Sequence, residues 1–317
     1  MKVLVTGATG SIGRHVVRQL GEAGLEVRIA ARHPETLKPA SDVVRLPNFD
    51  APAEAFLAIM QDVTHVVHCA GLNNNAGNAS EADYRAANGE LTRQLARAAA
   101  LRASGRFIYL SSIRAVVGPG FSGTVDEATA PAPQCAYGRS KREGEIRTLD
   151  AYASSGRSDA AVLRLPPIYG DGMKGNLASL MRLADTAWPL PAAALAGVRS
   201  LMSSEAAART VSHLLTRSKP LRPVYVAGNE PPTPLAAIIG AFRQGFQRPA
   251  RLFAMPAAPL RAAATLLGKG KFWETLTATQ ICDPSLLISE GWVPETDTIE
   301  RLADMARRSK SEPDPFR

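Results

Sequence analysis

The chain has 317 residues, 45% of them apolar and 21% charged, with a formal net charge of +8. This composition is that of an ordinary packed globular protein. The positive charge forms no Lys/Arg block with interleaved aromatics, so no nucleic-acid partner is expected. Cys69, Cys135 and Cys282 lie far apart without a CxxC or metal-binding spacing, which excludes a disulfide framework and a zinc site and fits a cytoplasmic location. We also expect no signal peptide and no membrane partner, because no apolar run of about twenty residues is present.

Strands and helices alternate along the first half of the chain. Apolar segments predict strands at 2–7, 25–31, 43–46, 64–71 and 106–112, and a further strand that begins at 159 and ends at the double proline Pro166-Pro167. Periodic segments predict helices at 11–24, 52–61, 84–103 and 137–155. This alternation predicts a parallel sheet with right-handed crossovers, and the nearly continuous apolar strands predict helices on both of its faces. The predicted fold class is therefore α/β, with a doubly wound sheet of the Rossmann type.

The pattern changes after Pro166, where Pro and Gly become frequent and segments shorten. One more strand is predicted at 223–229, and helices are predicted at 234–245, 256–267 and 298–308. The apolar stretch 255–268 predicts a core helix, with an interfacial helix as the alternative. We predict a dinucleotide-binding part at 1–165 and a smaller, mostly helical substrate-binding part at 166–317, packed on the first. Only 309–317 is expected to lack order.

A glycine-rich loop, Gly7-Ala8-Thr9-Gly10-Ser11-Ile12-Gly13, joins the first predicted strand to the first predicted helix. Glycines permit a tight turn and a close approach of an anion to the backbone, and the helix directs free N–H groups at that anion. The loop predicts a site for the pyrophosphate of a dinucleotide. The residues expected to contact this cofactor are Gly7, Thr9, Gly10, Ser11, Ile12 and Gly13.

The end of the second predicted strand bears on the choice of cofactor. A carboxylate there would bind the ribose 2′-hydroxyl of NAD, but the chain reads Ala30-Ala31-Arg32-His33-Pro34. The guanidinium of Arg32 matches the 2′-phosphate of NADP, so NADP is favoured over NAD. An exposed loop arginine without this role is the alternative.

A Tyr-x-x-x-Lys pair, Tyr137 and Lys141, lies on the predicted helix 137–155. Residues four apart share a helix face, and a nearby cation lowers the pKa of a phenol, so Tyr137 can exchange a proton with a substrate hydroxyl. About twenty-five residues earlier a strand ends in Ser111-Ser112. Ser112 is the expected partner of Tyr137, because Ser111 still belongs to the strand.

The order of TGATGSIGR, the Ser-Ser strand end and YGRSK resembles the extended branch of the short-chain dehydrogenase/reductase superfamily, the NAD-dependent epimerase/dehydratase family. The resemblance implies a catalytic triad of Ser112, Tyr137 and Lys141. A different alignment of the following loop places Ile113 at the serine position.

The same resemblance implies further site residues. For the cofactor, beside Tyr137 and Lys141, these are Asp50, Ala70, Gly71, Asn88 and Pro166. Asp50 is equally explained as a helix N-cap. For the substrate, they are Lys174, Asn176, Leu177 and Arg199. Dehydratases of the family have acidic residues directly after the triad serine or threonine, whereas Ile113 and Arg114 follow Ser112 here, so a dehydratase is not expected.

Three functions stay open at this point. The resemblance favours an NAD(P)-dependent epimerase or 4-ketoreductase acting on a nucleotide-activated sugar. An NADP-dependent reductase of a non-sugar carbonyl is the second possibility, and a non-catalytic cofactor-binding protein is the third. The resemblance also implies a homodimer formed through the two long helices 84–103 and 137–155.

Overall fold

A seven-stranded parallel sheet forms the centre of the structure, a computed structural model that describes residues 1–37, 42–74, 77–193 and 195–311. The strand order is β11-β7-β5-β4-β1-β2-β3, and every neighbouring pair is parallel. The strands are β1 (Lys2–Thr6), β2 (Glu26–Ala31), β3 (Val43–Arg45), β4 (His65–His68), β5 (Phe107–Ser112), β7 (Ala160–Leu165) and β11 (Val224–Val226). The predicted Rossmann-type sheet is confirmed.

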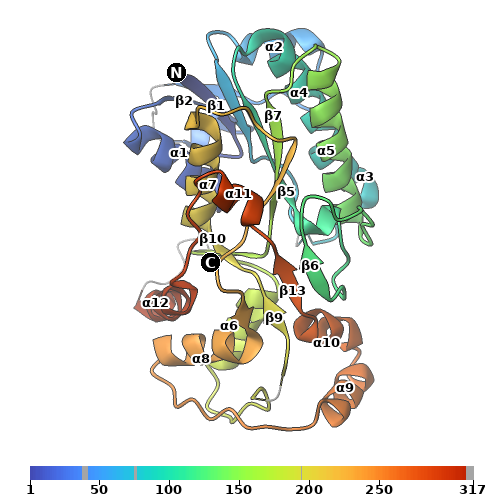
Figure 1. The fold of residues 1–317 in the computed structure, drawn as a ribbon, viewed down its shortest axis with the longest axis vertical. Coiled ribbons are helices and arrows are strands. Elements are labelled where there is room, and N and C mark those ends of the chain that lie inside the picture. The colour runs from blue at the N-terminus through green and yellow to red at the C-terminus, as the bar shows by residue number, and fades with distance from the viewer. Residues whose placement is uncertain (38–41, 75–76, 194, 312–317) are drawn as a thin grey trace.

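Helices cover both faces of this sheet (Figure 1). On one face lie α1 (Gly13–Glu22) and α7 (Ser204–Thr216), and on the other lie α2 (Ala53–Ile59), α4 (Leu91–Arg102) and α5 (Ala136–Ala153). Successive side chains of a strand point to opposite faces. Accordingly Val3 and Val5 join the core beneath α1 and α7, while Leu4 joins the core beneath α2 and α4.

Two prolines end the last strand predicted in the first half of the chain. Proline has no N–H to donate to a sheet, and β7 ends at Leu165, just before Pro166 and Pro167. The chain continues as β8 (Ile168–Tyr169), which pairs with β10 (Met202–Ser203) in a separate two-stranded sheet. The predicted end of this strand at the double proline is therefore confirmed.

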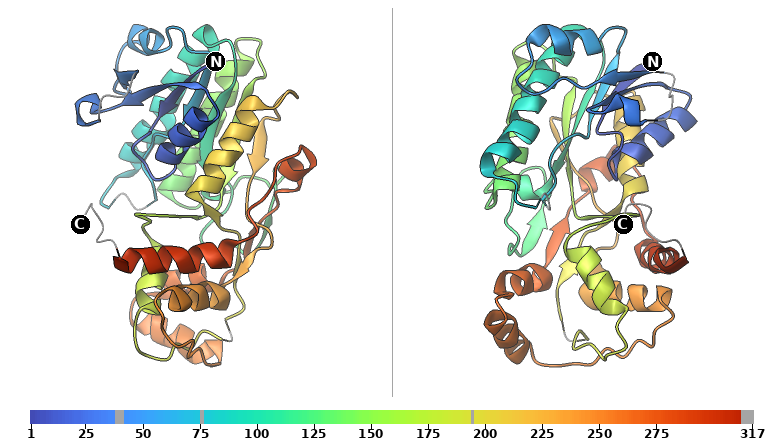
Figure 2. Two further views of the ribbon diagram at one scale, coloured as in Figure 1. Left: turned by 90° about the vertical axis from the view of Figure 1, so that its left-hand side faces the viewer. Right: turned by 180° about the vertical axis from the view of Figure 1, so that it is seen from behind.

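The C-terminal part packs helices against a small mixed sheet that the sequence analysis did not predict. The strands of this sheet, in spatial order, are β12 (Thr233–Pro234), β9 (Val198–Arg199), β13 (Gln280–Cys282) and β6 (Gly123–Val125). Its helices are α6 (Asn176–Ala184), α8 (Leu235–Gly245), α9 (Ala257–Leu266), α10 (Gly270–Thr277), α11 (Ser285–Ser289) and α12 (Thr298–Ser311). Helix α12 crosses α8 (Figure 2), and both share a core with α6.

The two parts of the chain exchange elements. Strand β6 comes from the first 165 residues but pairs with β13, whereas α7 and β11 come from the second part but complete the central sheet. Residues 309–311 end α12, so the expected lack of order there is wrong, and residues 312–317 lie outside the described part of the chain.

The prediction that the helix 256–267 belongs to the core is wrong. The corresponding helix, α9, contains no buried residue, and its packing partner is α10. Its alanines and leucines are distributed around the helix, so no single apolar face is directed at the core. Among the described residues, none of the helices combines the length and apolarity required to span a bilayer.

The predicted helix 84–103 begins earlier and changes pitch. It consists of α3 (Glu81–Tyr84), a π-helical segment η2 (Arg85–Glu90) and α4, and Ser80 and Asp83 form a capping box at its start. Short 3₁₀ turns lie at η1 (Pro34–Thr36) and η3 (Ile113–Ala115). π-helical segments are frequent at functional sites because they redirect side chains, and this segment contains the buried Asn88.

A buried polar chain links the central strands to α4. The Thr6 hydroxyl and His68 Nδ1 share a hydrogen bond of 2.7 Å, and His68 Nε2 and the Thr92 hydroxyl share one of 2.9 Å. The Thr92 hydroxyl donates in turn to the Asn88 carbonyl. Burial lowers the pKa of His68 to about 3, and the charge of Lys141 acts in the same direction.

The low pKa of His68 predicts acid sensitivity of the fold. Its ordinary pKa is 6.5, so protons bind the unfolded chain first, and the stability contributed by neutral His68 is lost as pH falls from 6.5 toward 3. One such group contributes a slope of about 1.4 kcal/mol per pH unit. Urea unfolding between pH 7.5 and 5 should therefore show a shallower pH dependence for His68→Gln than for the wild type. Equal slopes would contradict this assignment.

Candidate active site

A pocket opens at the carboxyl ends of the central strands, where doubly wound folds place their ligands. The glycine loop, the loop after β4, the end of β5 and the start of α5 meet there. The residues lining it are Gly7, Gly10, Ser11, Ile12, Gly13, Cys69, Gly71, Leu72, Asn73, Leu110, Ser111, Tyr137, Lys141 and Leu165. The structure therefore brings the predicted glycine loop and the Tyr-Lys pair into one pocket.

The glycine loop fits a dinucleotide pyrophosphate. Gly7 has a φ of +68°, and a Cβ there would lie 2.6 Å from the Ala70 nitrogen. A Cβ on Gly13 would lie 2.1 Å from the Gly7 carbonyl oxygen, so larger residues cannot replace either glycine in this turn. The first turn of α1 has no side-chain cap and no acidic residue. The Arg14 and His15 amides donate to the Gly10 and Ile12 carbonyls within the turn, and the positive dipole end of α1 is available to an anion.

Tyr137 lines the pocket, and Ser112 lies close to it. Tyr137 is the second residue of α5, and Ser112 is the last residue of β5, whose hydroxyl accepts from the Arg114 amide at 3.2 Å. Burial raises the pKa of Tyr137 to about 12, while the Ser112 hydrogen bond and the charge of Arg114 oppose that shift. The phenol therefore holds its proton at neutral pH unless further positive charge is supplied.

Lys141 lies on the same face of α5 but points to the strand. Its Nζ donates to the Leu110 carbonyl at 2.6 Å and lies 4.2 Å from the centroid of the Tyr109 ring. Burial lowers the pKa of Lys141 to about 7, with Glu145 opposing the shift. The sequence analysis expected the ammonium to act on the phenol directly. In the structure it bonds the strand end, because the Leu110 carbonyl is the acceptor that β5 offers to α5.

Ser111 has a separate set of partners. Its hydroxyl donates to Glu145 Oε1 at 2.7 Å, and Arg164 on β7 binds both carboxylate oxygens of Glu145 at 3.0 and 2.9 Å. Arg142 adds a second cation at 2.8 Å. This buried cluster fastens α5 to β5 and β7. Ser111 therefore points away from Tyr137, whereas Ser112 points toward Tyr137.

Two glycines of α5 allow the helix to approach β5 closely. A Cβ on Gly138 would lie 2.2 Å from the Arg114 carbonyl oxygen, and a Cβ on Gly144 would lie 2.3 Å from the Tyr109 hydroxyl. Gly138 directly follows Tyr137, so its missing side chain brings the phenol within reach of Ser112.

Asn88 organises the pocket from behind. It is fully buried, its Oδ1 accepts from the Leu72 amide at 2.8 Å, and its Nδ2 donates to the Leu72 carbonyl and to the Ser140 hydroxyl. A Cβ on Gly71 would lie 2.3 Å from Asn88 Oδ1. Asn88 therefore holds the loop after β4 against α5, and it does not line the pocket itself.

The remaining cofactor residues lie around the pocket at different depths. Ala70 donates its amide to Thr6, and Pro166 follows the pocket residue Leu165. Arg32 is exposed at the end of β2, and its guanidinium has no partner among the described residues. Asp50 is exposed, and because Pro52 is the N-cap of α2, Asp50 does not cap that helix. Thr9 is also exposed.

The predicted substrate residues separate into three groups. Lys174 and Asn176 are exposed at the start of α6, and Leu177 is buried in the core shared with α8. Arg199 is buried on β9, and its Nη2 has no hydrogen-bond partner in the described structure. Burial, with the nearby charge of Arg114, lowers the pKa of Arg199 to about 10.

Arg114 is a buried cation that the sequence analysis did not assign to the site. Its guanidinium donates to the Gly118 carbonyl at 2.8 Å and to Gln280 Oε1 at 2.7 Å. Gln280 is the register partner of Arg199 between β13 and β9. Arg114 and Arg199 therefore create a positive region beside Tyr137. A lone arginine in a loop gave no signal of this in the sequence.

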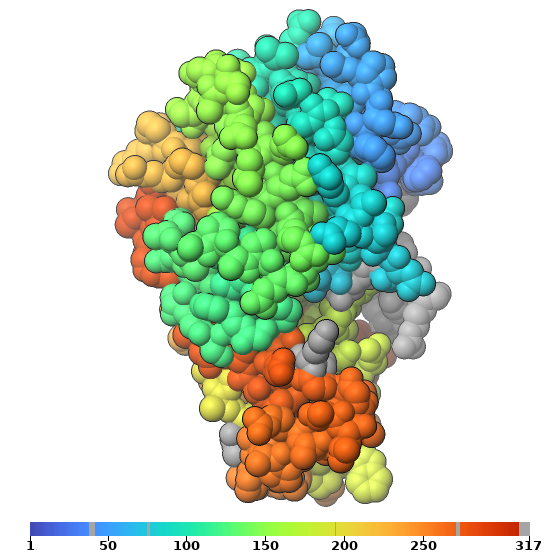
Figure 3. All heavy atoms as spheres, turned by 90° about the vertical axis from the view of Figure 1, so that its right-hand side faces the viewer, coloured from blue at the N-terminus to red at the C-terminus, as the bar shows by residue number. Residues whose placement is uncertain are grey.

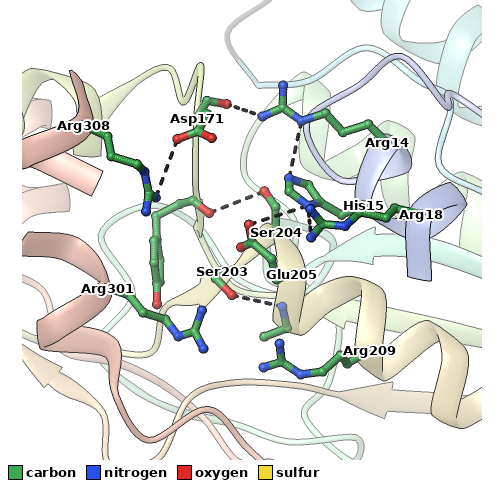
Figure 4. A network of polar contacts seen from close by, with 12 residues as sticks. Arg14, His15, Arg18, Asp171, Ser203, Ser204, Glu205, Arg209, Arg301 and Arg308 are labelled. Atoms are coloured by element: carbon green, nitrogen blue, oxygen red, sulfur yellow. Dashed lines mark hydrogen bonds and ion pairs between the residues drawn. The ribbon is translucent and has the colours of Figure 1, made fainter. Parts of the chain in front are cut away.

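A polar network joins the glycine-loop helix to the C-terminal part (Figure 4). Arg14, next to Gly13, donates to the Asp171 carbonyl at 2.8 Å, and the Asp171 carboxylate lies 3.8 Å from Arg308 on α12. His15 lies 3.6 Å from Glu205 at the start of α7. The loop that leads to Lys174 is thus anchored to the glycine-loop helix.

Comparisons with known proteins agree with this geometry. The model of the NAD dependent epimerase/dehydratase family matches residues 3–227. UDP-glucose 4-epimerase of Vibrio cholerae is 28% identical over 309 residues, which cover 92% of this chain and 90% of the relative. dTDP-4-dehydrorhamnose reductase of Burkholderia thailandensis is 30% identical over 187 residues, 58% of this chain and 56% of the relative.

Solved structures show the same fold. UDP-glucuronic acid 4-epimerase from Bacillus cereus, in complex with UDP-glucuronic acid and NAD, superposes with a TM-score of 0.76 at 19% identity and covers 98% of this chain and 99% of that one. UDP-glucose 4-epimerase of Thermus thermophilus, in complex with NAD, gives 0.73 at 19% identity, with the same coverage. The chain belongs to the NAD-dependent epimerase/dehydratase family and is an enzyme of the extended short-chain dehydrogenase/reductase type.

The different partners of the two serines predict different phenotypes. Ser112→Ala removes the partner of Tyr137, so kcat should fall by about 100-fold or more while the fold stays intact. Ser111→Ala leaves buried Glu145 with one hydrogen bond fewer, so it should lower the free energy of unfolding by about 1–3 kcal/mol and change kcat little. Steady-state kinetics and urea unfolding of both variants measure this. The opposite pattern would assign the catalytic role to Ser111.

Proposed function

We propose that the chain is a nucleotide-sugar 4-epimerase that uses Ser112, Tyr137 and Lys141. The observation that carries this proposal is the shared pocket, in which Tyr137 and Lys141 lie beside a glycine loop that fits a pyrophosphate, with Ser112 close to Tyr137. Similarity to the Vibrio cholerae UDP-glucose 4-epimerase along nearly the whole chain supports it.

A bound nicotinamide cofactor would supply the hydride acceptor and donor. Tyr137 would take the proton of the sugar hydroxyl, with the Ser112 hydroxyl holding the reacting oxygen. Because burial raises the pKa of Tyr137 to about 12, this step depends on positive charge at the phenol. Buried Arg114 is a cation that favours the phenolate. Lys141, which donates to the Leu110 carbonyl in this structure, would add positive charge on turning toward the phenol.

The nucleotide part of the substrate has a matching feature in Arg199. Its buried, unpartnered Nη2 and the nearby Arg114 favour a phosphate group of the substrate. Lys174 and Asn176, exposed at the start of α6, would contact the same diphosphate, and Leu177 would support them from the core. The proposed homodimer would use α4 and α5, which pack side by side.

Arg32 favours a second candidate, an NADP-dependent 4-ketoreductase of a nucleotide sugar. Its exposed guanidinium directly follows β2, and a cation at this point of a dinucleotide-binding fold supports binding of an adenosine 2′-phosphate. A reductase would use the same triad, with Tyr137 giving its proton to the product alkoxide.

Removing the phenol hydroxyl tests the catalytic assignment. Tyr137→Phe should reduce kcat on the productive nucleotide sugar by about 100-fold or more, because the acid–base group is lost. The Kd for the cofactor should change little, since the glycine loop is untouched. Turnover of a panel of UDP- and dTDP-sugars, with cofactor binding measured by calorimetry, provides both readouts. An active Tyr137→Phe enzyme would refute the triad.

Arg32 separates the two cofactors. If its guanidinium binds the 2′-phosphate, Arg32→Ala should weaken NADP binding by about tenfold and leave NAD binding unchanged. Calorimetric Kd values for both cofactors, in the wild type and the variant, measure this. Tighter binding of NAD by the wild type, with no effect of the substitution, would assign the enzyme to NAD.

A further inference from the structure

The end of the C-terminal part that lies farthest from the central sheet has an unusual surface. This distal end consists of residues 186–193, residues 248–255 and α9 with the following Lys269. A backbone bridge between Leu190 and Leu252 joins the first two segments. Figures 1 and 3 show the yellow-green and orange segments at the end of the molecule opposite the sheet.

Large apolar side chains are exposed at the distal end. Trp188 is 77% exposed and Phe253 is 40% exposed, each beside the backbone bridge. At the end of α9, Leu266 is 89% exposed and Leu267 is 73% exposed. Large exposed apolar side chains gathered at one end of a molecule mark a surface that is covered in use.

Helix α9 buries too little apolar surface to explain its stability in water. An isolated helix of its ten residues is marginal, and stability normally comes from burying an apolar face. Yet α9 has no buried residue, and it ends in a formed cap in which Gly268 has a φ of +69° and the Lys269 amide donates to the Ala264 carbonyl. A surface that covers α9 would supply the missing stabilisation.

The charge of the distal end has one sign. No Asp or Glu occurs between Glu230 and Glu274 in the sequence. Arg251, Arg261 and Lys269 are exposed there. Two further arginines of the region already have partners within the protein. Arg243 donates to backbone carbonyls and Arg248 pairs with Asp185, so neither is available to a partner surface.

We propose that the distal end docks on an anionic lipid surface, which the loops around Trp188 and Phe253 and the C-terminal end of α9 would contact. Apolar side chains would enter the boundary between headgroups and acyl chains, and the three exposed cations would pair with lipid phosphates. Trp188 matches the preference of tryptophan for this boundary. None of the residues that line the active-site pocket belongs to the distal end.

The charge favours a lipid surface over a second copy of the chain. Two distal ends facing each other would bring Arg261 and Lys269 against like charges, whereas anionic headgroups complement them. The interaction would be peripheral, because it uses one short helix and two loop segments.

Vesicle sedimentation tests the proposal on the full-length protein. With phosphatidylcholine vesicles containing phosphatidylglycerol, the protein should sediment at low salt and be released as salt rises. With phosphatidylcholine alone it should stay in the supernatant. Leu266→Ser/Leu267→Ser should reduce the partition coefficient by about tenfold or more, and Arg261→Glu/Lys269→Glu by about tenfold.

Matched controls lie away from the distal end and from the helices of the proposed homodimer. Val293 is 78% exposed and Lys219 is exposed, so Val293→Ser and Lys219→Glu should leave vesicle binding unchanged. Circular dichroism should show that all variants are folded. Binding that persists in both distal-end variants, equal binding to neutral vesicles, or no binding to anionic vesicles would overturn the proposal. So would analytical ultracentrifugation that shows dimerisation through the distal end in place of lipid binding.

Discussion

The close packing of α5 on the carboxyl end of β5 is the constraint on which the site depends. Gly138 and Gly144 permit the approach, since a side chain at either position would collide with Arg114 or Tyr109. Glu145 then fixes the helix through Arg164 and Ser111, a buried ion pair whose carboxylate is fully engaged by hydrogen bonds. With the helix in this position, the phenol of Tyr137 meets Ser112 and the ammonium of Lys141 meets the strand end. The chemistry proposed for the pocket follows from this packing.

The C-terminal part completes the site by bringing charge to it. Strand β9 carries Arg199 and β13 carries Gln280, and the latter holds Arg114 beside Tyr137. The small sheet that contains these strands includes β6 from the first half of the chain. The proposed substrate site and the proposed catalytic pair are therefore parts of one packed unit, and the contact between Arg14 and Asp171 strengthens the junction.

Local sequence signals account for the central sheet and the glycine loop, because apolar strands, periodic helices and a glycine turn are each encoded within a few residues. The small sheet escaped prediction because its strands are two or three residues long and pair across distant segments. The prediction that α9 belongs to the core was wrong, because apolar composition alone does not specify whether a helix is buried. Lys141 contacts Leu110 because α5 packs closely on β5, and the spacing of residues in the sequence does not reveal how closely a helix packs on a strand. Glu145 could have been found, since it follows Lys141 by four residues and so shares its helix face.

The central claim is that the pocket moves hydride between a nicotinamide and a nucleotide sugar. The most direct measurement is the near-ultraviolet absorbance of the nicotinamide during a single turnover, with the enzyme loaded with cofactor and mixed rapidly with UDP- or dTDP-sugars. The account predicts a redox change of the nicotinamide with at least one of these sugars, transient for an epimerase and permanent for a reductase. A loaded enzyme that binds a nucleotide sugar without any change in nicotinamide absorbance would contradict it.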